Sequence, residues 1–377
     1  MSQSTMQQLA QHGQSAWLDF ISRSMLDSGK LEELIQNGLR GMTSNPSIFN
    51  NAIGQTNEYD EQIIKYKHQG KSTFEIYDEL TIKDIQEACD LFAEVYKKTN
   101  RLDGYVSLEI NPKLANKVGE QIDEGLRLFK KVKRPNCMIK VPSTQEGFPV
   151  IEELIANKVN VNVTLIFSLE QYMETVQAYF RGLDRLSKKV NDLSVVRSVA
   201  SVFVSRIDTL VDKQLSELLS KEKDETKKAK LQQLKGKAAV ANCRIIFEKF
   251  KQLFFSDEFK RLFDKGANEQ RVLWGSTSTK NPEYKDIKYV TELITKPTIN
   301  TIPEKTLYAF LDHGEVKEAF AYPVEAAEET IEELRQCGID IDKVCLKLLD
   351  DGVVAFEDAF EALMHSIEKK AAQLSLR

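Results

Sequence analysis

The sequence alternates short apolar runs with longer amphipathic segments. Eight of these runs are rich in β-branched residues and have the length of strands; they span residues 17–22, 41–44, 105–110, 137–142, 160–167, 196–204, 271–276 and 299–302. Strands that alternate with helices are typical of βαβ units and a parallel sheet. Eight such units predict an α/β fold with a single (β/α)8 TIM barrel, and a doubly wound open sheet is the natural alternative. We favour the barrel because the sequence contains neither the G-x-G-x-x-G turn of such open sheets nor a P-loop.

Helical periodicity fills the segments between the runs. Apolar residues recur at helical spacing in residues 81–98, 112–132 and 169–186. The segment near residues 210–240 contains SKEKDETKKAKLQQLKGK, whose dense mixed charge indicates a solvated helical insertion rather than a binding surface. Residues 353–374 predict an amphipathic C-terminal helix packed on the barrel. The expected organisation is one barrel domain over residues 1–377, with this charged insertion and additional helices.

Composition excludes several classes of partner and site. The formal net charge of -5 argues against nucleic acid as a partner. The 5 cysteines are scattered and odd in number, which suits reduced thiols better than a disulfide framework or a zinc site. The 4 histidines are too dispersed for metal-ligand spacing, so we expect no metal. The N-terminus lacks a secretory pattern and no apolar run is long enough to span a bilayer, so we expect a cytoplasmic protein without a membrane partner.

The stretch NCMIKVPSTQEG places one lysine, Lys140, in the middle of an apolar strand. Alternation along a strand puts Met138 and Lys140 on one face, and Ile139 and Val141 on the other. Lysine is seldom fully buried unless it is paired, and burial disfavours the charged form of an amine. A neutral amine is a nucleophile that forms Schiff bases with carbonyl substrates. From this stretch alone the alternative stays open, namely a lysine that extends to solvent or pairs with a carboxylate.

Polar residues also stand at the ends of the predicted strands that would meet at the mouth of a barrel. The first seven strands supply, in chain order, Asp19, Asn45, Glu109, Lys140, Thr164, Ser201 with Arg206, and Ser278 with Lys280. Each is weak evidence alone, because Asp, Asn and Thr at strand ends are commonly turn or cap residues. The placement of polar residues from seven strands at one rim is stronger evidence for a site.

Proton transfer assigns roles to the acidic members of this set. Schiff-base chemistry moves protons on and off the carbinolamine and the substrate hydroxyls, and Asp19 and Glu109 are the only carboxylates on the rim. Thr164 can hold the water through which a proton passes.

The two cations on the rim besides Lys140 suit a substrate phosphate. Arg206 can bind a phosphate bidentately, and Lys280 adds a second positive charge. The alternative for Arg206 is a salt bridge to Asp208 or Asp212, and the motif alone does not choose between them.

Seven blocks of sequence now point to a family. GMTSNPSIF, SLEINP, MIKVPSTQEG, NVNVTLIFS, SVASVFVSRIDTLVD, GSTSTKNPEYKD and NTIPEKTL resemble the transaldolases in their longer bacterial form, and they follow the order of the predicted strands over most of the chain. The resemblance implies a barrel of the class I aldolase type, with the Schiff-base lysine on the fourth strand and with neither metal nor cofactor. It also implies transfer of a dihydroxyacetone unit from sedoheptulose 7-phosphate to glyceraldehyde 3-phosphate, giving erythrose 4-phosphate and fructose 6-phosphate, in the pentose phosphate pathway.

The resemblance assigns catalytic roles residue by residue. Lys140 looks like the Schiff-base lysine, and Asp19 looks like the acid/base that serves C–C cleavage. Glu109 and Thr164 look like the pair that orients the relay water.

The other matched residues would bind substrate. Asn45 and Ser201 would contact the dihydroxyacetone part, whereas Arg206, Ser278 and Lys280 would hold the phosphate. Lys280 is a departure, since shorter transaldolases carry arginine there, and a lysine lacks the bidentate fork.

Two alternatives remain within the resemblance. Related fructose-6-phosphate aldolases release free dihydroxyacetone, and they tend to have Gln and Tyr where this chain has Glu109 and the substrate-binding Phe203. Both residues here favour transfer. A barrel that only binds sugar phosphates would be indicated by loss of Lys140, Asp19 or Glu109, and all three are present. The sequence leaves the oligomeric state open.

Overall fold

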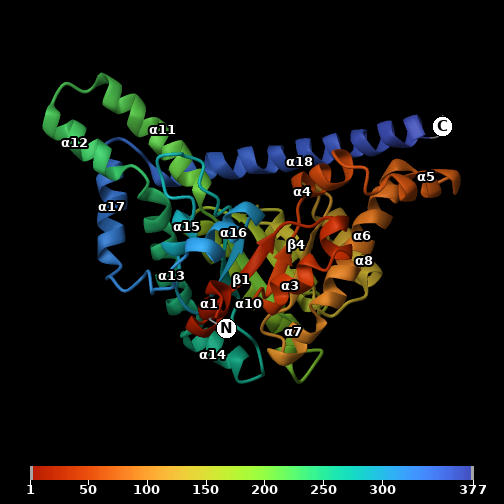
Figure 1. Ribbon diagram of the computed structural model, residues 1–377. Helices are drawn as coiled ribbons and strands as arrows, with labels where there is room; N and C mark the ends of the chain where they lie inside the picture. The colour runs from red at the N-terminus through yellow and green to blue at the C-terminus, as the bar shows by residue number, and fades with distance from the viewer. Residues whose placement is uncertain (1–2, 375–377) are drawn as a thin grey trace.

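The computed structural model describes residues 3–374 of the chain. Eight parallel strands pair in chain order, and the eighth pairs with the first to close a barrel (Figure 1). The strands are β1 (Gln14–Asp19), β2 (Gly41–Thr43), β3 (Tyr105–Glu109), β4 (Cys137–Pro142), β5 (Val161–Ile166), β6 (Ser198–Phe203), β7 (Arg271–Gly275) and β8 (Thr298–Ile302). The prediction of a (β/α)8 barrel is confirmed.

Helices surround the barrel and connect its strands (Figure 1). Before β5 they are α1 (Thr5–His12), α2 (Arg23–Asp27), α3 (Lys30–Gln36), α4 (Pro46–Phe49), η1 (Asn50–Gly54), α5 (Asp60–His68), α6 (Thr73–Leu91), α7 (Ala93–Lys98), η2 (Pro112–Leu114), α8 (Val118–Val132) and α9 (Gly147–Ala156). After β5 they are α10 (Leu169–Ser187), η3 (Leu193–Val195), α11 (Ser205–Lys221), α12 (Glu225–Leu234), α13 (Ala238–Phe254), α14 (Asp257–Phe263), α15 (Lys288–Thr291), α16 (Glu304–His313), α17 (Glu325–Gln336) and α18 (Ile341–Leu374).

Several predicted boundaries of strands and helices are wrong. The strand predicted at 17–22 ends at Asp19, because Ser22 instead caps α2 by accepting a hydrogen bond from the backbone of Met25. The helix predicted at 81–98 is the end of α6 followed by α7, and α6 begins much earlier at a capping box formed by Ser72 and Glu75. The C-terminal helix likewise begins at Ile341, well before the predicted start.

Strand alternation sorts the barrel interior into layers. One layer is an apolar cluster made of Trp17, Tyr105, Met138, Val199, Leu273 and Ile299. Gly41 makes room for it, since a Cβ there would lie 2.5 Å from the indole of Trp17. Two residues further along each strand the side chains point inward again. The polar residues in that next layer, towards the carboxyl ends of the strands, build the candidate site.

The longest helix, α18, crosses the carboxyl ends of the barrel strands (Figure 1). It packs against β5, α4, α6 and α11. Close approach is possible at Gly352, where a Cβ would lie 3.0 Å from Cδ2 of Leu165 and 3.6 Å from Nη1 of Arg206. Within residues 3–374 no helix has the length and apolar character that crossing a bilayer requires.

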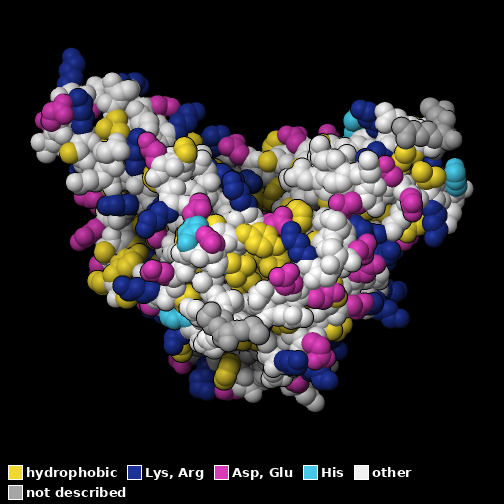
Figure 2. Space-filling view, viewed as in Figure 1, with side chains coloured by type: hydrophobic (Ala, Val, Ile, Leu, Met, Phe, Trp, Pro, Cys, Tyr) yellow, Lys and Arg dark blue, Asp and Glu magenta, His cyan; other side chains and the backbone are white. Residues whose placement is uncertain are grey.

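The charged segment near residues 210–240 forms the end of α11 and the whole of α12, which project from the barrel as an arm (Figure 1). Side chains of both signs cover this arm (Figure 2). Its inner side is held by buried Leu231 and Leu234, and an ion pair of 3.3 Å joins Lys230 to Glu333 of α17. The organisation as one domain stays a prediction.

Candidate active site

Lys140 lies inside the barrel on β4, and its side chain is 5% exposed. Its Nζ donates a hydrogen bond to the backbone oxygen of Ser44 at 3.1 Å and lies 3.6 Å from Oε2 of Glu109. The two residues face each other because Glu109 and Lys140 are register partners on β3 and β4. The lysine therefore does not extend to solvent, although it does meet a carboxylate.

Glu109 is a buried carboxyl group with few partners. Its Oε2 has no hydrogen-bond partner among residues 3–374, and only the longer contact with the Lys140 ammonium lies nearby. Burial and, to a smaller extent, the charge of Asp19 raise the pKa of Glu109 to about 7, against the opposing effect of Lys140. The group can therefore gain or lose a proton near neutral pH.

Asp19 ends β1 and is held by a pair of threonines. Thr43 Oγ1 donates to Asp19 Oδ1 at 2.7 Å, and the hydroxyls of Thr43 and Thr301 lie 2.7 Å apart. Because the hydroxyl proton of Thr43 is used in the hydrogen bond to Asp19, the Thr301 hydroxyl must donate to Thr43. Burial raises the pKa of Asp19, whereas the charges of Lys140 and Lys280 lower it. Sequence reasoning missed both threonines, although alternation from Gly41 and Ile299 would have placed them inside the barrel.

Thr164 lies on β5 where the strand is irregular. The pairing of β5 with β6 shifts register between Val163 and Ile166, and Leu165 has a φ of 59°, a region that non-glycine residues seldom adopt. Thr164 itself is buried, and its Oγ1 has no hydrogen-bond partner within the described part of the chain. Strain and unpaired polar groups of this kind cluster at functional sites.

Ser201 and Asn162 form a second polar group inside the barrel. Ser201 Oγ donates to Asn162 Oδ1 at 2.6 Å, and Asn162 Nδ2 donates to Ser107 Oγ at 3.0 Å. All three are buried. Asn162 was not predicted as a site residue, but it stands two positions before Thr164 and so shares its face of the strand.

Asn45 caps the N-terminus of a helix, a role that asparagine commonly has. Its Oδ1 accepts a hydrogen bond of 2.9 Å from the backbone N–H of Ile48, which caps α4 directly after β2. The contact of Asn45 with substrate stays a prediction.

Arg206 stands in the first turn of α11 beside the barrel mouth. Its guanidinium lies 5.5 Å from the ring centre of Phe203. Burial lowers the pKa of Arg206, and the charge of Asp351 on α18 opposes this. In residues 3–374 Arg206 forms no ion pair with Asp208 or Asp212, because both carboxylates are hydrogen bonded to tyrosines instead. The salt-bridge alternative is therefore wrong, and Arg206 is a partly buried cation.

Ser278 and Lys280 lie in the loop that follows β7. Lys280 is exposed, and its Nζ donates to Ser278 Oγ at 2.8 Å. The charge of Lys280 lowers the pKa of Asp19, which places this ammonium within electrostatic reach of the barrel mouth. The structure thus gathers an amine and two carboxyl groups inside the barrel, with two further cations at its edge. Such a set suits addition to a carbonyl, proton transfer and binding of an anionic group.

Comparisons with known proteins agree with this chemistry. The family model described as Transaldolase/Fructose-6-phosphate aldolase matches residues 16–367. A transaldolase of Trichodesmium erythraeum is 44% identical over 366 residues, which cover 96% of each chain. Transaldolase 2 of a Nostoc species is 42% identical over 98% of each chain, and a transaldolase of Saccharopolyspora erythraea is 40% identical over 98% of each.

Proposed function

Because the chain belongs to the transaldolase/fructose-6-phosphate aldolase family, we propose that it is a transaldolase of the pentose phosphate pathway. It transfers a dihydroxyacetone unit from sedoheptulose 7-phosphate to glyceraldehyde 3-phosphate and gives erythrose 4-phosphate and fructose 6-phosphate, reversibly. The observation that carries the proposal is the buried Lys140 amine 3.6 Å from the buried Glu109 carboxyl group.

Lys140 is the nucleophile in this proposal. Its Nζ adds to the ketone carbon of the donor, and the carbinolamine then loses water to give a Schiff base. The protons of these steps pass through a water between Glu109 and Thr164. Two observations support this relay: Oε2 of Glu109 and Oγ1 of Thr164 are buried without hydrogen-bond partners among residues 3–374, and the pKa of Glu109 is raised to about 7.

Asp19 serves the C–C step. It takes the proton from the C4 hydroxyl of the donor as the C3–C4 bond breaks. The aldose leaves, and the bonding electrons pass into an enamine that stays covalently attached to Lys140. The enamine carbon then attacks the aldehyde of the acceptor, and Asp19 returns its proton to the new hydroxyl. Water finally releases the ketose and restores the amine. The raised pKa of Asp19 supports this role.

The remaining residues bind substrate. Asn45 and Ser201 contact the dihydroxyacetone part, and Phe203 forms an apolar wall beside it. Arg206, Ser278 and Lys280 hold the phosphate, and the support for this is that Arg206 forms no ion pair within residues 3–374 and that the ammonium of Lys280 is exposed. The proposed reaction requires neither metal nor cofactor, and sugar phosphates in the cytoplasm are the proposed partners.

An acceptor assay separates this function from the alternatives. Fructose 6-phosphate with erythrose 4-phosphate should give sedoheptulose 7-phosphate and glyceraldehyde 3-phosphate, with little turnover when the acceptor is left out. Release of free dihydroxyacetone without acceptor would instead identify a fructose-6-phosphate aldolase. Binding of fructose 6-phosphate with no product in either assay would indicate a barrel that only binds sugar phosphates.

A further inference from the structure

The proposed phosphate site is divided between two elements that are distant in sequence. Arg206 comes from α11, whereas Ser278 and Lys280 come from the loop between β7 and α15. Lys280 is exposed, and within residues 3–374 its Nζ bonds only the hydroxyl of Ser278 two residues away, so the position of the loop sets the position of this cation. Noncovalent contacts between α11 and the loop must therefore hold the site together. The inference below rests on the proposed function.

One group of these contacts between α11 and the loop lies at the barrel. The backbone N–H of Ser205 donates to the oxygen of Ser276 at 3.1 Å, and their hydroxyls lie 3.2 Å apart. The preceding N–H, that of Val204, donates to the oxygen of Gly275 at 3.0 Å. The start of α11 and the start of the loop are thus joined as extensions of neighbouring strands.

Further from the barrel, a hydrogen bond between a tyrosine and an aspartate connects the loop to α11. Tyr284 donates its phenol proton to Asp212 Oδ2 at 2.6 Å, and the backbone N–H of Gly236 donates to Asp212 Oδ1 at 2.9 Å. Burial and the charge of Asp212 raise the pKa of the Tyr284 phenol, which keeps the proton available for this bond. Gly236 has a φ of 69°, and a Cβ there would lie 2.7 Å from the Tyr284 ring. Asp212 therefore joins α11, the loop and the segment between α12 and α13.

A second tyrosine and aspartate pair repeats this arrangement closer to the core. Tyr289 donates to Asp208 Oδ2 at 2.7 Å, and the backbone N–H of Ala239 donates to Asp208 Oδ1 at 2.8 Å. Asp208 and Asp212 are four residues apart and so lie on the same face of α11. Tyr289 and Asp208 are buried, whereas Tyr284 and Asp212 are partly exposed. The outer pair is therefore the one that can be altered without opening the core.

We propose that the hydrogen bond between Tyr284 and Asp212 positions the phosphate site by holding Ser278 and Lys280 at a fixed place relative to Arg206. Both residues act through the cations and are positioning residues. Their bond makes the protein selective for phosphorylated substrates. It leaves the chemistry at Lys140 untouched, because that lysine is held by β4 inside the barrel.

Tyr284→Phe tests this directly, because it removes the hydroxyl and keeps the ring. We expect KM for fructose 6-phosphate to rise about tenfold, in line with a lost hydrogen bond to a charged group, while kcat stays within about twofold. The matched control is Tyr179→Phe, which removes a phenol hydrogen bond of 2.7 Å to the backbone oxygen of Asn268, before β7 and away from the loop. The control should leave KM unchanged.

Calorimetric titration with inorganic phosphate gives a readout that does not depend on turnover. Wild type should bind phosphate, Tyr284→Phe should bind it about tenfold more weakly, and Tyr179→Phe should match wild type. Asp212→Ala, which removes both acceptor oxygens, should also weaken binding. The double variant should lose less phosphate affinity than the product of the two single fold-losses, because both substitutions remove the same bond.

The outcomes separate this inference from the proposed function. Unchanged KM and unchanged phosphate binding in Tyr284→Phe, or a loss confined to kcat, overturn the positioning role even if the wild-type enzyme is an active transaldolase. Weaker phosphate binding in Tyr284→Phe supports the role even if wild type has no transaldolase activity. A wild-type protein that binds no phosphate and shows no turnover overturns both.

Discussion

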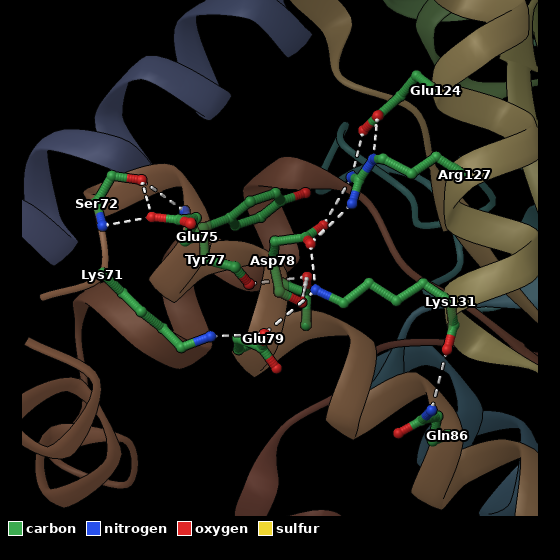
Figure 3. Close-up of polar contacts among 11 residues, drawn as sticks. Lys71, Ser72, Glu75, Tyr77, Asp78, Glu79, Gln86, Glu124, Arg127 and Lys131 are labelled. Atoms are coloured by element: carbon green, nitrogen blue, oxygen red, sulfur yellow. Dashed lines mark hydrogen bonds and ion pairs between the residues drawn. The ribbon is translucent and has the colours of Figure 1, made fainter. Parts of the chain in front are cut away.

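The barrel mouth and the outer contact between α6 and α8 both contain buried carboxyl groups beside cations, but they pair them differently. In the outer network Asp78 accepts hydrogen bonds from Arg127 at 2.8 and 2.9 Å and from Lys131 at 2.7 Å (Figure 3). Glu79 and Glu124 complete the network by bonding the same two cations. Each charge there has at least one short partner.

The pKa shifts of the two regions differ in sign as a result. Burial alone would raise the pKa of Asp78, but hydrogen bonds from Arg127 and Lys131 hold it below its ordinary value. At the mouth the Glu109 side chain has an exposed fraction close to that of Asp78, 7% against 6%. Within residues 3–374, however, its only cationic partner is Lys140 at 3.6 Å, and its pKa rises to about 7. Burial is therefore a poor marker of function by itself, whereas a buried charge with few hydrogen bonds is a good one.

The largest expected effect separates the two lysines. Lys140→Ala should abolish turnover, because no other amine lies on the inner face of β4, while the fold and phosphate binding persist. Lys131→Ala in the outer network should retain turnover within about twofold, since it removes only partly exposed ion pairs to Asp78 and Glu79. Steady-state assays of both variants check this, and near wild-type activity of Lys140→Ala would break the comparison.

Asp19→Asn should give the next largest loss. The amide can still accept the hydrogen bond of Thr43 but cannot take a proton, so kcat should fall about 10²- to 10⁴-fold, the usual contribution of a positioned acid or base. Asp19→Asn with wild-type kcat would show that another group accepts the proton in C–C cleavage.

Arg206→Ala should act on binding rather than on chemistry. Removal of a partly buried cation that we propose to bind the substrate phosphate should raise KM for fructose 6-phosphate about 10- to 100-fold, as expected for charged hydrogen bonds. Affinity for free dihydroxyacetone should change far less. Equal losses for both ligands would mean that Arg206 supports the fold through its contact with Phe203.

Glu109→Gln should change the pH dependence. Burial raises the pKa of Glu109 to about 7, so the carboxylate that accepts protons forms only as pH rises through that value. We expect kcat/KM of wild type to increase through this range and to lose the ionisation in Glu109→Gln. A profile from pH 5 to pH 9 checks this, and an unchanged rise near pH 7 in the variant would assign the ionisation to another group.

Asp78→Asn should show the smallest effect on activity and a visible one on stability. The variant weakens the hydrogen bonds to Arg127 and Lys131, so the free energy of unfolding should fall by about 1–3 kcal/mol while kcat and KM stay within about twofold. Denaturant unfolding and assays on the same sample check both. A large loss of kcat would remove the distinction between the two regions.

Sequence patterns predicted the parts of the site that depend on neighbours along the chain. The alternation that placed Lys140 beside Met138 correctly put both inside the barrel, and the same rule holds for Glu109. It failed to single out Thr43 and Asn162, because threonine and asparagine near strand ends commonly serve as turn or cap residues. Their role is visible only through the hydrogen bonds they make to other strands.

Contacts between distant segments could not be predicted. The bond from Tyr284 to Asp212 joins positions 72 residues apart, and neither residue stands in an apolar pattern that marks it. The closeness of Gly352 to Arg206 depends on α18 crossing the barrel mouth, whereas the sequence indicated only that a terminal helix would pack on the barrel. Such contacts follow from the three-dimensional path of the chain.

The most direct test of the central claim is covalent trapping at Lys140. The protein is incubated with fructose 6-phosphate and borohydride, digested, and mapped by mass spectrometry. A reduced three-carbon adduct on the peptide that contains Lys140, absent from Lys140→Ala, is the predicted result. Absence of any adduct in folded protein that still binds fructose 6-phosphate, or an adduct on a different lysine, would contradict the account.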